Sequence, residues 1–234
     1  MSEKISSRTY DSSLEKSLQS NFNKAYHLCG MSFYRTKDKA TQINAGDVVA
    51  VNNNKPYFIE EKCAAANYQK DLKTFSLELS FIPCDKKTNK PLEYRTSGWL
   101  IKDNIQTDIY SFGYVRAKSK ENLQNNNLDR FEVIMVKRDI LLKYIQEKIG
   151  DIDRIKKLEC EFRKRAKEGK SEKYGAEDKT RYREIPAKGF RLCWSPYLAE
   201  SPVNLLIDKK ILEQLAFRHI VLTGKKYITE GFLD

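Results

Sequence analysis

The sequence predicts an α/β protein in which helices pack on the faces of a central mixed sheet. Two kinds of apolar spacing predict it. Apolar residues recur at three- and four-residue intervals over residues 13–30 and 138–150, which is typical of amphipathic helices. Short β-branched and aromatic runs lie between them, and residues 74–81 alternate strictly between apolar and polar side chains, as in a half-buried strand.

The N-terminal elements are a helix, a short strand and a hairpin. The helix over residues 13–30 ends at Gly30, a residue suited to a helix C-terminus. Residues 31–36 are expected to be extended. The apolar runs at 47–51 and 57–62 flank three asparagines, and this pattern predicts a β-hairpin.

Further strands are expected after the hairpin. They are predicted at residues 74–81, 98–102, 108–117 and 131–137, with a polar loop over 84–97. Each run is rich in aromatic and β-branched residues, which suit a pleated and partly buried surface.

The last third of the chain contains helices and a charged stretch. A helix is predicted over residues 138–150 and another over 208–218. Residues 151–184 are dense in charge and poor in large apolar side chains, so we expect an exposed helix followed by a mobile loop. No repeat or linker is visible. We therefore predict one domain over residues 1–234, with the charged segment as a helical insertion.

The charge balance favours a polyanionic partner. The chain has 43 Lys and Arg against 32 Asp and Glu, a net charge of +11. Residues 137–191 alone hold 18 basic and 11 acidic residues. This basic run is either a solvated helix face or an arm that contacts nucleic-acid phosphates. The residues assigned to such an arm are Lys156, Lys157, Arg163, Lys164, Arg165 and Lys167.

Several classes of protein are disfavoured. No apolar stretch is long enough to cross a membrane, and the polar N-terminus lacks the apolar core of a signal peptide. Five scattered cysteines without a C-x-x-C pair argue against a disulfide framework or a zinc site and favour the cytoplasm. The two histidines, His27 and His219, are far apart in sequence and are expected to be structural.

The hairpin carries charges that require an explanation. If its turn centres on Asn53 and Asn54, Asp47 lies opposite Glu60, with Cβ atoms roughly 4.5–5.5 Å apart. Such a carboxylate pair suits a divalent cation. Lys62 shares the face of Glu60, because side chains alternate along a strand. The alternative is a charged hairpin face on an ordinary sheet, where Lys62 only pairs with Glu60.

An aspartate at the start of one strand and E-x-K on the next resemble the catalytic pattern of the PD-(D/E)XK nuclease superfamily. The resemblance covers residues 14–115 and the short piece "SPVNLLI" near the C-terminus. Over these residues the chain also resembles a group of bacterial and phage proteins placed in that superfamily. It implies a restriction-endonuclease-like fold, a central mixed β-sheet flanked by helices. The proline of the "PD" motif is absent, since Gly46 precedes Asp47.

The resemblance also implies roles for individual residues. Asp47 matches the first acidic residue, Glu60 the second and Lys62 the lysine, while Glu15 resembles an extra acidic residue on the preceding helix. Asp47, Glu60 and the carbonyl of Glu61 would hold Mg²⁺ or Mn²⁺, and Lys62 would position the attacking water.

The predicted function is metal-dependent hydrolysis of phosphodiester bonds in nucleic acid, with DNA as the expected partner. Two alternatives stay open. The first is a nucleic-acid-binding module that keeps the nuclease fold but does not cut, and the second is a structural or assembly protein whose charge keeps it soluble. A homodimer is the oligomer under consideration.

Overall fold

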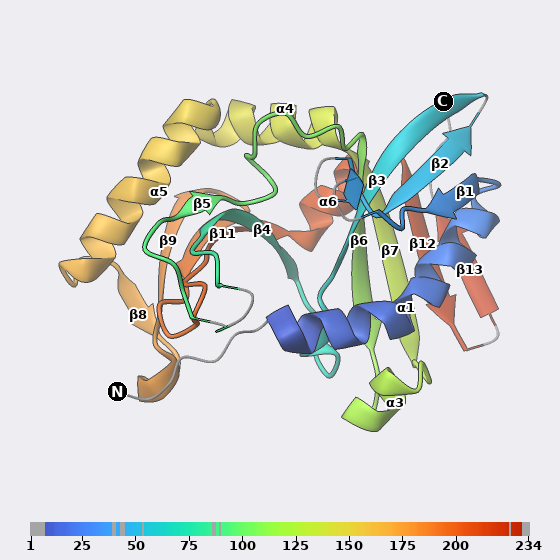
Figure 1. Cartoon of the computed structure of the whole chain (residues 1–234), viewed down its shortest axis with the longest axis horizontal. Helices are drawn as coiled ribbons and strands as arrows, with labels where there is room; N and C mark the ends of the chain where they lie inside the picture. The colour runs from blue at the N-terminus through green and yellow to red at the C-terminus, as the bar shows by residue number, and fades with distance from the viewer. Residues whose placement is uncertain are drawn as a thin grey trace. The chain divides into compact units, whose positions relative to one another are not determined.

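The computed structural model describes residues 8–38, 41–42, 45–52, 54–85, 88, 90–224 and 226–230, in two compact units (Figure 1). Unit 1 is Met1–Tyr10, Thr74–Asp103 and Lys143–Asp208, and unit 2 is Asp11–Lys73, Asn104–Leu142 and Lys209–Asp234. Each unit has its own sheet and helices, so the predicted α/β class is confirmed at that level. The chain passes between the units several times, which explains why no linker marks them in the sequence.

Unit 2 contains a seven-stranded mixed sheet. Its strands, in spatial order, are β1 (Ser32–Arg35), β2 (Val48–Asn52), β3 (Lys55–Cys63), β6 (Ile109–Arg116), β7 (Arg130–Lys137), β12 (Arg218–Thr223) and β13 (Lys226–Glu230). Only the pair β3–β6 is parallel. Strands β6 and β7 are buried along almost their whole length, as their nearly continuous apolar sequences predict for the centre of a sheet.

Helix α1 (Arg8–Leu28) covers the central strands of unit 2 (Figure 1). Its residues Leu14, Leu18 and Phe22 are buried, and the Phe22 ring lies 5.1 Å from that of Phe131 on β7. The short helices of this unit are η1 (Ala65–Asn67), α3 (Lys120–Gln124) and α6 (Lys209–Leu215). None of the helices in the described part of the chain combines the length and apolarity needed to cross a membrane.

Unit 1 contains a six-stranded antiparallel sheet. Its strands, in spatial order, are β5 (Thr96–Ser97), β4 (Thr74–Phe81), β11 (Val203–Asp208), β10 (Phe190–Trp194), β9 (Arg181–Ala187) and β8 (Glu172–Tyr174). Helix α4 (Arg138–Ile149) begins in unit 2 and continues into unit 1. Helix α5 (Ile152–Lys167) follows and buries Ile155 and Phe162. The short helix η2 (Glu177–Lys179) joins β8 to β9.

The strand predicted over residues 98–102 is wrong, because these residues form a turn. The Gly98 N–H donates to the carbonyl of Leu79, and the Leu100 N–H donates to that of Glu78. A Cβ atom at Gly98 would lie 2.3 Å from the Glu78 carbonyl oxygen. The glycine therefore lets the chain fold tightly over β4, and Leu100 is buried by the turn rather than by a sheet.

The mobile loop expected around residues 166–179, within the charged stretch 151–184, is also wrong, because this part of the chain contains strand β8 and leads into β9. Strands β8 and β9 pair antiparallel there and extend the sheet of unit 1. Glu172 and Arg183 lie opposite each other and form an ion pair, and Tyr174 pairs with Arg181. Opposite charges across the two strands make this charged sequence compatible with a sheet edge.

Candidate functional site

The β2–β3 hairpin has the register predicted from the sequence. Val48 lies opposite Ile59, and Asn52 lies opposite Lys55. Asn54 adopts a left-handed conformation, φ 62°, which asparagine tolerates better than most residues. The turn therefore fixes which side chains share each face of the two strands.

Asp47 lies immediately before β2 and beside β3. Its backbone N–H donates to the carbonyl of Ile59, at 2.9 Å, and its carboxylate Oδ2 accepts the backbone N–H of Glu61, also at 2.9 Å. The pairing of β2 with β3 begins at Val48 and Ile59, so Asp47 does not pair with Glu60 as predicted. Asp47 attaches to β3 through both its backbone N–H and its carboxylate. Gly46, which stands in place of the superfamily's proline, has φ 138°, a value that proline cannot adopt.

Glu60 and Lys62 form an ion pair on one face of β3, as the alternation of the strand predicts. Both side chains are mostly buried. Glu60 lies opposite Tyr110 of the parallel strand β6. Burial raises the pKa of the Tyr110 phenol, and the Glu60 charge adds to that rise. The E-x-K pair is therefore in contact, with one carboxylate and one ammonium in a mostly buried setting.

Glu61 points to the other face of β3 and has its own partners. Its carboxylate accepts hydrogen bonds from Arg35, at 2.9 and 3.1 Å, and from the Tyr26 hydroxyl, at 2.9 Å. Burial raises the pKa of the Glu61 carboxyl, while the Arg35 guanidinium opposes that rise. The Glu61 carboxylate is therefore not available on the face of β3 that carries Glu60. On that face, Glu61 can offer a metal ion only its backbone carbonyl. The sequence does not reveal this network, because Arg35 lies on a different strand.

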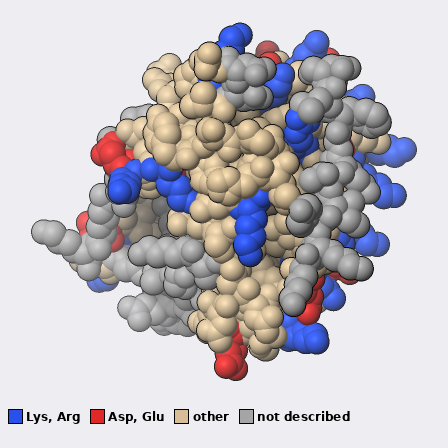
Figure 2. Space-filling model, turned by 90° about the vertical axis from the view of Figure 1, so that its right-hand side faces the viewer, with Lys and Arg blue, Asp and Glu red and all other residues tan. Residues whose placement is uncertain are grey.

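The remaining predicted site residues belong to helices α1 and α5. Glu15 belongs to α1, but its side chain lies outside the described residues. Figure 2 shows the face at the right-hand side of Figure 1, where basic side chains lie both across and at the margins of an uncharged surface. The exposed members of the predicted basic arm are Lys157, Lys164 and Lys167. Lys156 is partly exposed, and its Nζ lies 3.7 Å from Asp103 Oδ2.

Two members of that arm form ion pairs with carboxylates of the protein itself, and their contribution to nucleic-acid binding stays a prediction. Arg163 holds the buried carboxylate of Glu159 with two nitrogens, at 2.8 and 3.0 Å. Arg165 Nη2 lies 2.6 Å from Glu184 Oε2 on β9. Glu159 lies on the buried side of α5 and requires a cation there, so its neighbour on the next helical turn is drawn inward.

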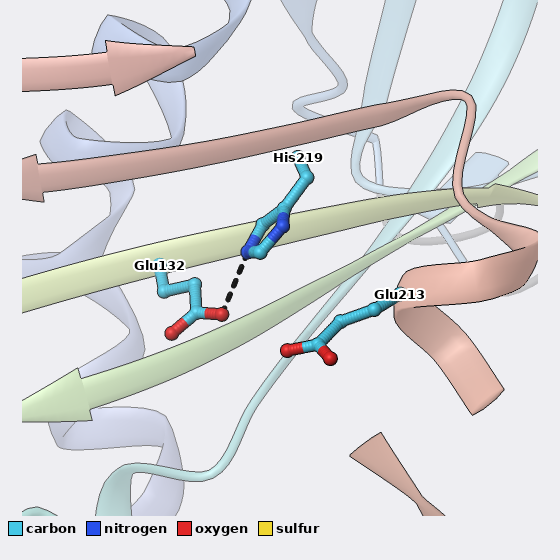
Figure 3. A group of neighbouring side chains, drawn as sticks. All are labelled: Glu132, Glu213 and His219. Atoms are coloured by element: carbon cyan, nitrogen blue, oxygen red, sulfur yellow. Dashed lines mark hydrogen bonds and ion pairs between the residues drawn. The ribbon is translucent and has the colours of Figure 1, made fainter. Parts of the chain in front are cut away.

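A second cluster, which sequence reasoning missed, lies in unit 2 (Figure 3). Among the described residues, Glu132, Glu213 and His219 each offer one atom that could bind a metal ion. These three atoms lie within 4.8 Å of one another. Glu132 is 2% exposed at the centre of the sheet, and His219 Nε2 lies 2.7 Å from its Oε1. Glu132 is a lone charge in the apolar run of β7, and that interruption was the available signal.

This cluster already contains cations. Lys209 Nζ lies 2.6 Å from Glu132 and 3.6 Å from Glu213, and Arg130 Nη2 lies 2.7 Å from Glu132. Burial raises the pKa of the Glu132 carboxyl, but the hydrogen bonds from His219 and Lys209 outweigh burial and lower it overall. The Lys209 ammonium occupies the place that a metal ion would take between the carboxylates. The donor set could hold a metal only if Lys209 withdrew.

Comparison with protein-family models, with curated proteins and with solved structures finds no match to this chain. The resemblance of Asp47, Glu60 and Lys62 to the nuclease pattern therefore stays a hypothesis. A functional assignment has to be supported by the geometry of these residues.

Proposed function

We propose that the protein is a metal-dependent nuclease that hydrolyses phosphodiester bonds in DNA, and that unit 2 is its restriction-endonuclease-like part. One observation carries the proposal. Two hydrogen bonds hold Asp47 against β3, and Glu60 and Lys62 lie in contact on one face of that strand while the Glu61 side chain points to the other. The mixed sheet, covered by α1, supplies the frame for these residues.

The donor atoms fit a hard divalent cation. Asp47, Glu60 and the carbonyl of Glu61 offer only oxygen, which Mg²⁺ and Mn²⁺ prefer. Such an ion would supply a more acidic bound water and would offset charge on the scissile phosphate. Lys62 would then leave Glu60, orient the attacking water and stabilise negative charge as the phosphate reacts.

Nucleic-acid binding draws on the exposed basic residues. Lys157, Lys164 and Lys167 on α5 provide contacts to backbone phosphates, which position a strand without reading its sequence. We place the protein in the cytoplasm, since its five scattered cysteines without a C-x-x-C pair suit a reducing compartment.

A second candidate is a nucleic-acid-binding module that does not cut. Its specific support is that Asp47 and Glu60 both have protein partners, the Glu61 N–H and the Lys62 ammonium. The carboxylates are thus satisfied without a divalent ion, and the basic surface alone would suffice for binding.

The variants Asp47→Ala and Lys62→Ala distinguish these functions. Asp47→Ala removes a metal ligand, so Mn²⁺ affinity and cleavage should both fall. Lys62→Ala removes no ligand, so Mn²⁺ should still bind while cleavage falls by about 100-fold or more, because lysine acts only as charge develops. Lys55→Ala is the matched control, since Lys55 is an exposed lysine at the start of the same strand.

The measurements are calorimetry with Mn²⁺, melting curves, and cleavage of plasmid, single-stranded DNA and RNA with Mg²⁺, Mn²⁺ or EDTA. Wild-type protein without divalent-dependent cleavage of any substrate would support the non-cutting module. Normal cleavage by both variants would show that the site has been misplaced.

A further inference from the structure

Arg95, just before β5 in unit 1, carries a half-buried guanidinium without a carboxylate partner among the described residues. Its Nη1 donates to the Ser201 carbonyl, at 2.9 Å, and to the Ser80 hydroxyl, at 3.2 Å. Its Nη2 lies 3.4 Å from the Ser201 hydroxyl. Neutral oxygens therefore hold the side chain in place, but they do not balance its charge.

A second guanidinium lies close to the first. Arg163 uses two nitrogens to hold the buried carboxylate of Glu159, at 2.8 and 3.0 Å. The same carboxylate accepts the Ser80 hydroxyl, at 2.6 Å, and Arg95 reaches Glu159 only through that hydroxyl. Only Arg163 contacts this carboxylate directly, so Arg95, Arg163 and Glu159 together carry one excess positive charge.

The excess charge is costly where it lies. Burial and the charge of the neighbouring Arg163 together lower the pKa of Arg95 to about 10, and the charge of Glu159 offsets only part of this decrease. A partly buried charge normally has a counter-charge, because removing it from water is unfavourable. The donors of Arg95 are held in a fixed position, so an anion that arrives would not have to order the side chain first.

We propose that Arg95 and Arg163 form a subsite for a single phosphate group. The planar guanidinium donates two parallel hydrogen bonds and matches phosphate oxygens, which makes arginine the usual residue for this ligand. The phosphate belongs either to the backbone of a nucleic acid or to a free or terminal phosphate. The subsite goes beyond the proposed nuclease function, since it lies within unit 1 and requires neither a metal nor the hairpin residues.

The test is phosphate binding by the whole protein in EDTA, with chloride used to keep the ionic strength constant. Calorimetry gives the affinity, and the ¹⁵N-detected Nε–H resonance of Arg95 reports contact at the site. Inorganic phosphate should bind to the wild type, and Arg95→Gln should lose at least about tenfold in affinity, as one charged bidentate contact implies. Arg95→Lys keeps the charge without the fork and should lose affinity as well.

Lys188→Gln is the matched control, since it removes one exposed positive charge from the same unit at a residue outside the proposed phosphate contacts, and it should bind phosphate within twofold of the wild type. Oligonucleotides with and without a 5′-phosphate distinguish the two sources: equal affinity indicates the backbone, and preference for the 5′-phosphate indicates a terminal group. The proposal is overturned if wild-type protein responds to phosphate no more than to chloride, or if both Arg95 variants bind as the wild type does. Because no cleavage is measured, failure of the nuclease proposal would leave this result interpretable.

Discussion

Replacing Glu132 by Gln is expected to lower the free energy of unfolding by about 3 kcal/mol. Glu132 is 2% exposed and accepts contacts from Lys209, at 2.6 Å, and from Arg130 and His219, both at 2.7 Å. Removing one partner of a buried ion pair costs roughly 3–5 kcal/mol. The lower end applies, because Arg130 is 41% exposed and Lys209 retains Glu213 at 3.6 Å.

Urea unfolding followed by circular dichroism measures this change. Glu213→Gln is the matched control, because Glu213 is 34% exposed and makes the longer contact with Lys209. A partly exposed pair of this kind contributes about 1 kcal/mol or less. The reasoning is refuted if Glu132→Gln unfolds within about 1 kcal/mol of the wild type, or if Glu213→Gln is equally destabilising.

The difference in unfolding free energy between the wild type and Glu132→Gln is also expected to depend on pH. The pKa of Glu132 is lower in the folded protein than in the unfolded chain, so the stability that its charge contributes is fully present above the unfolded value of about 4.3. That contribution is lost as the pH falls through the lower folded pKa. The stability difference between wild type and Glu132→Gln should therefore shrink in acid, and a difference that widens there would contradict the assignment.

Two further variants test the surface and the turn. Changing Lys156, Lys157, Lys164 and Lys167 to Gln should weaken DNA binding and reduce the slope of log affinity against log salt by about 0.9 for each lost phosphate contact, measured by fluorescence anisotropy. An unchanged slope would mean that this face of α5 is only solvated. Gly98→Ala should lower the melting temperature and destabilise the protein by about 1–3 kcal/mol, because its Cβ would collide with a backbone carbonyl of β4. Melting at the wild-type temperature would rule out that close approach.

The hairpin shows how far local sequence determines this protein. Three asparagines between two apolar runs predict the observed register of β2 and β3 once the turn is centred on Asn53 and Asn54. The alternation of side chains along β3 predicts that Glu60 and Lys62 share a face. Helix α1 and its end at Gly30, which has φ 68°, were predictable for the same reason. In each case the pattern has the period of the element, and the residues that decide it lie close together in the chain.

Apolar runs were less informative where the chain turns. Residues 98–102 resemble a strand in composition, but the close approach of Gly98 to β4 makes them a buried turn. The charged sequence of β8 and β9 resembles a loop, but its opposite charges pair across two strands. A short run of side chains does not reveal whether burial comes from a sheet or from another loop.

The sequence by itself determined the α/β class, most helices and strands, and the placement of the E-x-K residues on one strand face. Only the tertiary structure decided that Glu61 pairs with Arg35, that Glu132 pairs with Lys209, and that Arg163 is held by Glu159. A buried charge must have a partner, and for Glu61 and Glu132 that partner lies on another element far along the chain. Periodicity predicts which side chains are buried, whereas the partner of a buried charge depends on which elements the fold brings together.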